Sequence, residues 1–179
     1  SVEYSDIIQV FIPELKDTVI EQSIASINRS LLNANIRMAI LLKDIPNAKE
    51  ILERLKYSGA EQTVILNCIK HSTKSLTSKI ELKQFLSKLN IPFDIYHTYR
   101  YAIDTDYPRY NMLAYYHEIQ DASEPYLLKH LAIDGNTIKG IGYQGKEIAD
   151  VLHACLDEVI HHPENNDAKI LINMIKRTD

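Results

Sequence analysis

The chain has 179 residues, of which 45% are hydrophobic, and its formal net charge is −4. This composition is typical of a folded globular protein and excludes extensive disorder. No run of eighteen apolar residues occurs, so a membrane partner is not expected, and the first residues lack the basic and hydrophobic regions of a signal peptide. The two cysteines, Cys68 and Cys155, lie on apolar helical stripes and indicate no disulfide. A cytoplasmic protein is expected.

Apolar residues recur at helical spacing, whereas strict alternation of apolar and polar residues is rare. The pattern therefore predicts an all-α fold with no β-sheet. Helices are expected over residues 4–12, ending before Pro13, and over residues 17–32. A helix over residues 36–43 is apolar on nearly all sides and should be central. The next helix begins at residues 44–46.

Two serines are each followed three residues later by glutamate, which is the capping-box pattern of a helix start. Ser58 with Glu61 and Ser78 with Glu81 therefore predict two further helices. Prolines then divide the stretch 90–126 into short helices.

That stretch also holds eight of the eleven tyrosines, at positions 96, 99, 101, 107, 110, 115, 116 and 126. We interpret them mainly as packing residues, with stacking on nucleic-acid bases as the alternative.

Four of the five glycines fall in one window, at Gly135, Gly140, Gly142 and Gly145. An amphipathic helix over residues 148–160 follows. Glycine permits a positive φ and close approach to another molecule, and a helix N-terminus presents free N–H groups to anions. The window therefore indicates a phosphate contact or, alternatively, a tight turn. Asn165-Asn166 is expected to cap a final helix that reaches Arg177, which completes a terminal helical hairpin.

Catalytic and metal-binding patterns are weak. Asp104-Thr-Asp106 has the spacing of a metal-binding carboxylate pair, but its surroundings favour a solvated turn. Leu41-Leu-Lys-Asp-Ile45 is similar to the core of HD phosphohydrolases, with Lys43 where a ligating histidine would stand, and an ammonium has no lone pair for a metal. The seven histidines lack zinc-site spacing. No catalytic residue, metal ligand or cofactor is predicted in this chain.

Charge is distributed unevenly. Residues 70–109 carry seven Lys or Arg against four acids, whereas the remainder carries 13 against 20. Lys79, Lys83 and Lys88 are expected to form an exposed row opposite the apolar face of the helix that follows Ser78, where they could contact a sugar-phosphate backbone. A solvated helix face is the alternative.

Three patches in order along the chain resemble one family. Residues 131–148, with Leu131-Ala-Ile-Asp-Gly135 and Gly142-Tyr-Gln-Gly145, resemble the C-terminal signature of bacterial class II CCA-adding tRNA nucleotidyltransferases and their poly(A) polymerase relatives. Residues 51–61 are similar to the family's Leu-Lys-Phe-Ser-Asn-Lys-Glu segment, and Phe11-Ile-Pro-Glu-Leu15 is similar to its Phe-Pro-Glu-Leu.

The resemblance implies a helical body over residues 1–126, with a degenerate HD-like core, and a helical tail over residues 127–179. It also implies that the acceptor stem and elbow of tRNA bind to body and tail. Gly142, Gln144, Gly145 and Lys146 would contact phosphate at the tail, and Lys79, Lys83 and Lys88 would extend the path along the body.

The family's catalytic head, which would use Mg²⁺ with ATP and CTP, has no counterpart here. We therefore expect a C-terminal fragment that is inactive by itself. Two alternatives remain: a helical protein-interaction module that forms a homodimer, and a degenerate HD-type hydrolase.

Overall fold

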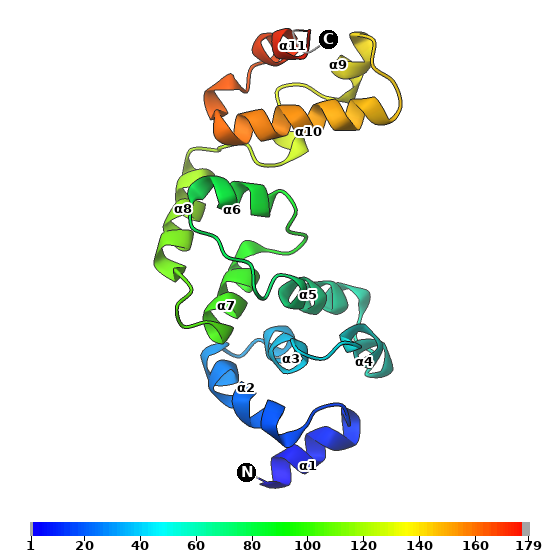
Figure 1. Ribbon diagram of the computed structural model, residues 1–179, viewed down its shortest axis with the longest axis vertical. Coiled ribbons are helices and arrows are strands. Elements are labelled where there is room, and N and C mark those ends of the chain that lie inside the picture. Colours follow the sequence, from blue (N-terminus) through cyan, green and yellow to red (C-terminus); the bar gives the residue numbers. More distant parts are fainter. Residues whose placement is uncertain (1, 177–179) are drawn as a thin grey trace. The chain divides into compact units, whose positions relative to one another are not determined.

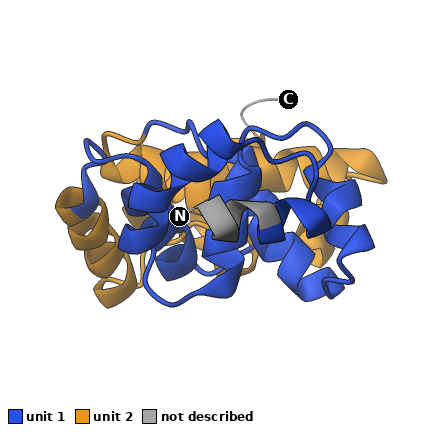
Figure 2. Cartoon of the chain, turned by 90° about the horizontal axis from the view of Figure 1, so that it is seen from below, with its two compact units in different colours: residues 1–75, 89–109 blue, residues 76–88, 110–179 orange. Residues whose placement is uncertain are grey.

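The computed structural model describes the backbone of residues 2–176 and the side chains of residues 7–176 (Figure 1). These residues form eleven α-helices and two short 3-10 helices, and no strand occurs among them. The predicted all-α fold is therefore confirmed. The chain divides into two compact units, which Figure 2 shows in different colours. Unit 1 comprises residues up to 75 together with 89–109, and unit 2 comprises residues 76–88 together with the chain from 110 onward.

Unit 1 contains six α-helices at or near the predicted positions. They are α1 (Val2–Phe11), α2 (Asp17–Arg29), α3 (Ala34–Leu42), α4 (Ala48–Arg54), α5 (Gly59–Lys70) and α7 (Phe93–Ile103). The α3 helix packs against α2, α5 and α7. Its Ile36, Ala39, Ile40 and Leu42 are almost fully buried, which confirms the prediction of a central helix.

Local polar contacts fix the ends of these helices. The Ser58 side chain accepts the Glu61 backbone N–H, and the Glu61 carboxylate accepts the Ser58 N–H at 2.8 Å, so the predicted capping box is complete. The Arg29 guanidinium on α2 donates two hydrogen bonds, of 2.7 and 3.0 Å, to the Ala102 carbonyl oxygen near the end of α7. That carbonyl has no partner within its own helix, so the arginine also ties α7 to α2.

Unit 2 is built from five α-helices and the two 3-10 helices. They are α6 (Lys79–Leu86), α8 (Arg109–Asp121), η1 (Leu128–His130), α9 (Gly135–Gly140), α10 (Lys146–His161), η2 (Pro163–Asn165) and α11 (Ala168–Lys176). Its core forms around α10, whose buried residues are Cys155, Leu156, Val159 and Ile160. Ile138 of α9 and Leu171 of α11 pack into the same cluster.

Two details of the predicted tail need correction. Part of the glycine window folds as α9, because the Asp134 side chain caps this helix by accepting the Thr137 N–H at 2.9 Å. The final helix is capped by Asp167, which accepts the Lys169 and Ile170 N–H groups, and not by Asn165-Asn166. Asn166 instead bridges to the chain at residues 130–132. Arg177 lies outside the described residues.

The two units do not follow the predicted division between residues 126 and 127. The α6 helix, together with residues 110–126, belongs to the same unit as the tail. The reason is packing at long sequence separation, because α6 lies against α10, about seventy residues further along the chain.

The first testable prediction concerns the end of α4. Lys56 adopts a positive φ of 61° as the chain leaves this helix, and the Tyr57 N–H donates to the Leu52 carbonyl oxygen. Only glycine adopts such a backbone without a steric cost. We expect Lys56→Gly to raise the free energy of unfolding by about 0.5–1 kcal/mol in urea titrations. Lys56→Ala, which keeps the Cβ atom, is the control, and an equal gain in that variant would contradict this account.

Candidate functional site

In the loop of residues 141–145, which leads into α10, partly buried and exposed residues alternate from 141 to 144. Ile141 and Tyr143 pack against the core of unit 2, as does Ile148 in the first turn of the helix. Besides Glu147, the exposed residues of the segment are Gly142, Gln144, Gly145 and Lys146. These are the four tail residues that the sequence predicts as phosphate contacts. The apolar anchors hold the loop in place, so its backbone faces solvent from a fixed position.

Two glycines in this loop are explained by backbone conformation. Gly142 has a φ of +114° and Gly145 a φ of +56°, values that residues with a side chain rarely adopt. Apart from the two neighbouring residues in the chain, no residue has a heavy atom within 4 Å of where a Cβ atom would stand on either glycine. The glycines are therefore required by the turn, and the space beside them is open.

The N-terminus of α10 carries a carboxylate of its own. Gly145 has no side chain to cap the helix, and Glu147 in the first turn accepts the Gln144 N–H at 3.4 Å. A negative charge at this position stabilises the helix dipole. A phosphate would therefore have to approach through Lys146 and the exposed side of the loop.

The predicted row of exposed lysines on α6 is wrong. Lys88 is exposed, but the side chain of Lys83 is only 1% exposed. Lys79 is partly buried and pairs with Glu124 at 2.8 Å and with Glu118 at 3.5 Å. Lys83 can be buried because its charge has close partners. One of them is Glu124, 41 residues further along the chain, and the periodicity of α6 gives no information about so distant a residue.

Lys83 connects three segments of unit 2. Its Nζ atom donates to Glu124 Oε2 at 2.9 Å and to the backbone oxygen of Ile160, in the last turn of α10, also at 2.9 Å. The other oxygen of Glu124 accepts from Lys79 Nζ. Both oxygens of this carboxylate are thus occupied by ammonium groups.

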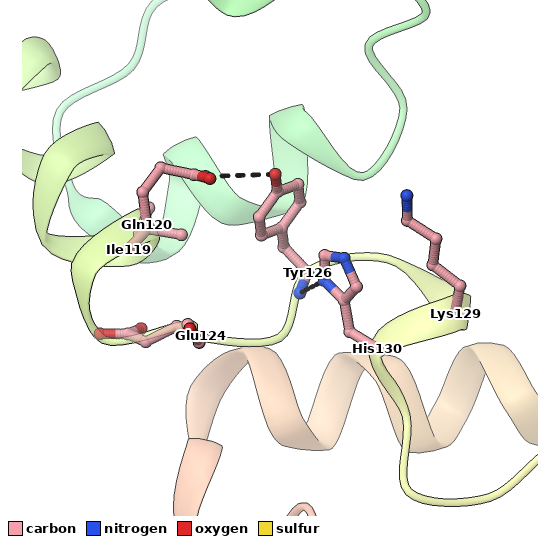
Figure 3. A pocket seen from close by; sticks show the side chains of 7 residues that line it. Ile119, Gln120, Glu124, Tyr126, Lys129 and His130 are labelled. Carbon is pink, nitrogen blue, oxygen red and sulfur yellow. Dashed lines mark hydrogen bonds between the residues drawn. The ribbon is translucent and has the colours of Figure 1, made fainter.

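Unit 2 also contains a pocket that the sequence patterns did not predict. It has a volume of about 510 Å³ and is lined by Ile119, Gln120, Ser123, Glu124, Tyr126, Lys129 and His130. Figure 3 shows the Tyr126 and His130 rings near its middle, with Lys129 to one side and Gln120 and Glu124 to the other. These residues come from the end of α8 and from the irregular chain into η1, which has no helical or strand periodicity. No sequence pattern marks them as a group.

Hydrogen bonds hold the aromatic residues of this pocket. The Tyr126 backbone N–H donates to His130 Nδ1 at 3.3 Å, and Gln120 Nε2 donates to the Tyr126 hydroxyl oxygen at 3.2 Å. The two rings meet edge to face, with centroids 4.9 Å apart. Burial lowers the pKa of His130, and the nearby Lys129 ammonium lowers it further. Both effects favour the neutral ring, in which Nδ1 accepts from Tyr126 and the proton lies on Nε2.

The carboxylates that suggested metal chemistry are occupied by local contacts. Asp104 follows α7 and accepts hydrogen bonds from Arg100 and from the Asp106 backbone N–H, as expected for a turn. Asp44 forms a close ion pair with Lys43, which stands where an HD protein has its histidine. Among the residues that the structure describes, no group of three or more His, Cys, Asp or Glu side chains could hold a metal ion.

The tyrosines and cysteines that the structure buries are packing residues. Tyr96, Tyr99 and Tyr107 are at most 5% exposed, and burial raises the pKa of each hydroxyl. Both cysteines are free and buried, and burial raises the pKa of the Cys68 thiol to about 12. A thiol with so high a pKa is a poor nucleophile.

Comparison of the chain with protein-family models, with curated proteins and with solved structures finds no match. Among the helices described between residues 2 and 176, none is long and apolar enough to cross a membrane.

The second testable prediction concerns the buried lysine. Lys83→Ala removes the partner of Glu124 Oε2 and leaves the Ile160 carbonyl without its donor. We expect the free energy of unfolding to fall by about 3–5 kcal/mol, as when one member of a buried ion pair is removed. Lys88→Ala, at an exposed lysine two residues beyond α6, should change it by less than about 0.5 kcal/mol. Equal effects of the two substitutions in urea titrations would show that the ion pair adds nothing.

The third prediction concerns pH. Burial raises the pKa of Glu124, but hydrogen bonds from Lys79 and Lys83 outweigh it and hold the pKa below the usual 4.5. The carboxylate therefore stabilises the fold above this value, and the stabilisation is lost as the pH falls through the pKa of the folded state.

We expect the stability difference between the native protein and Glu124→Gln to shrink from about pH 6 to about pH 3. Glu21→Gln, at an exposed glutamate, should give a small difference at every pH. A constant gap between native protein and Glu124→Gln would argue against the ionised pair.

Proposed function

We propose that this chain binds tRNA, as the body and tail region of a class II tRNA nucleotidyltransferase or poly(A) polymerase relative. The observation that carries the proposal is the loop before α10. Its apolar residues are anchored in the core, whereas Gly142, Gln144, Gly145 and Lys146 face solvent. A fixed, exposed backbone turn with a lysine beside it suits a sugar-phosphate backbone.

The contact surface in this proposal is smaller than the sequence suggests. Lys83 is buried and takes no part, and Lys79 is engaged by two carboxylates. Lys146 at the loop and Lys88 beyond α6 remain as exposed cations, and Lys139 of α9 is also exposed. With a net charge of −4, the protein would depend on such local positive groups to approach RNA.

Recognition of this kind reads shape and phosphate with little base readout, as expected for an A-form helix. In this proposal the addition of nucleotides from ATP and CTP, with Mg²⁺, is carried out by a catalytic head that this chain does not contain. The chain then contributes binding and orientation of the RNA.

The fourth prediction tests the loop. Filter binding at low salt should show tRNA bound more tightly than duplex DNA, with affinity falling as salt rises. Lys146→Glu should weaken tRNA binding by about tenfold, because one phosphate contact is replaced by a repulsion. Lys16→Glu, an exposed lysine of unit 1, is the matched charge control.

Two results would count against the proposal. Equal affinity for tRNA and duplex DNA would exclude tRNA as the specific partner. Unaltered tRNA affinity in Lys146→Glu would leave the glycines as a turn alone.

A second candidate is a protein-interaction module that pairs with another copy of this chain. It is favoured by an apolar stripe on α1, where Ile7, Val10 and Phe11 are 57%, 77% and 62% exposed. These positions lie on one helical face, and such a face on a soluble protein is often covered by a partner. Light scattering that found a stable dimer, with a mass unchanged by tRNA, would favour this candidate.

A further inference from the structure

The pocket at the end of α8 differs from the loop in offering a hollow that is open to solvent. Its size, about 510 Å³, lies within the usual range for sites that bind small molecules, roughly 300–1,000 Å³. Its lining is mostly polar. Among the described residues that line it, Ile119 is the only one with an aliphatic side chain. A polar site of this size suits a ligand with many hydrogen-bonding atoms.

The one carboxylate in the pocket is neutralised. Glu124 Oε1 accepts from Lys79 and Oε2 accepts from Lys83, at 2.8 and 2.9 Å. Lys79 also pairs with Glu118 at 3.5 Å, so two ammonium groups balance two carboxylates and this wall carries no net negative charge. Lys129 adds an exposed positive charge, and its ammonium forms no ion pair with the side chains of residues 7–176.

The remaining polar atoms are mainly donors. His130 Nδ1 accepts the Tyr126 N–H, so the neutral ring carries its proton on Nε2 and offers it as a donor. The Tyr126 hydroxyl oxygen accepts from Gln120 and keeps its own proton to donate. The Lys129 ammonium and the exposed Ser123 hydroxyl bring further donors. A site rich in donors and positive charge selects an anion rich in acceptors, which is the chemistry of a phosphate.

The aromatic rings add a second requirement. Figure 3 places the Tyr126 ring in the middle of the pocket, between Lys129 and the side chains of α8. A fixed aromatic face stacks on a nucleobase and tolerates any base. Inorganic phosphate would leave this face unused, and a nucleoside would leave the donors unused.

We propose that this pocket binds a single unpaired nucleotide of an RNA chain, with Lys129 and His130 holding the phosphate and the Tyr126 ring stacking on the base. This inference rests on the proposed function in one respect, namely that the nucleotide belongs to RNA. The pocket itself is tested with a mononucleotide.

The experiment is a titration of the full chain, labelled with ¹⁵N, with AMP, inorganic phosphate and adenosine in parallel. AMP should shift the amide signals of residues 123–130 and bind at least about tenfold more tightly than phosphate or adenosine. Lys129→Glu should weaken AMP binding by about tenfold or more, because it removes a charge-assisted contact. Lys169→Glu, an exposed lysine of α11, should leave AMP binding unchanged.

The variant Tyr126→Leu tests the contact with the base separately from the contact with the phosphate. It should weaken AMP binding and leave phosphate binding unchanged, with a dispersed spectrum confirming that the variant is folded. Absent shifts at residues 123–130, or equal weakening in the two lysine variants, would overturn the proposal. Equal affinity for AMP and phosphate would show that the pocket does not bind the base, and would overturn that part of the proposal.

The tRNA filter assay keeps the two proposals apart. Binding of tRNA without any effect of AMP on the pocket would refute the nucleotide site and leave the tRNA proposal standing. Binding of AMP at the pocket without binding of tRNA would refute the tRNA proposal and leave the nucleotide site standing.

Discussion

The ammonium group of Lys83 is buried, and burying a charge requires close partners. Glu124 and the Ile160 carbonyl oxygen supply them, from positions 41 and 77 residues further along the chain. Because these contacts bind α6 to the end of α10 and to the segment after α8, they explain why unit 2 is made of two separate stretches of sequence. A helix that would otherwise belong to its neighbours in sequence belongs instead to the tail.

The same interaction sets the electrostatics of the pocket. Glu124 lines the pocket, yet both of its oxygens are taken by lysines that lie on α6. Because of these ion pairs, both oxygens of the carboxylate in the described lining already accept hydrogen bonds from lysines. What remains is a surplus of donors around Tyr126 and His130. The stability of unit 2 and the preference for an anion that we propose for the pocket thus depend on the same ion pairs.

The loop before α10 follows a different principle. There the backbone conformation, and not a buried charge, determines which residues are exposed. Ile141, Tyr143 and Ile148 pack inward, so the residues between them must turn outward, and positive φ angles at Gly142 and Gly145 make that turn. The glycines are explained by the turn whether or not RNA contacts it. Lys146 is exposed and is not one of the residues with a positive φ, so a substitution there tests RNA contact separately from the turn.

Local features could be predicted from the sequence because they depend on residues three or four positions apart. The helical spacing, the central α3 helix and the capping box at Ser58 are of this kind, and the structure confirms each of them. The glycine window before α10 was also visible in the sequence, and the structure places a turn there with positive φ angles at Gly142 and Gly145.

The sequence by itself thus determined most of the helices and the apolar faces that they bury, but neither the short α9 helix nor the residue that caps α11. Only the tertiary structure decided that Lys83 is buried, that α6 joins the tail, and that Ser123, Tyr126, Lys129 and His130 line one pocket. The physical reason is that an ion pair or a pocket depends on distance in space. A periodic pattern along one helix carries no information about a glutamate or a carbonyl oxygen that lies dozens of residues away.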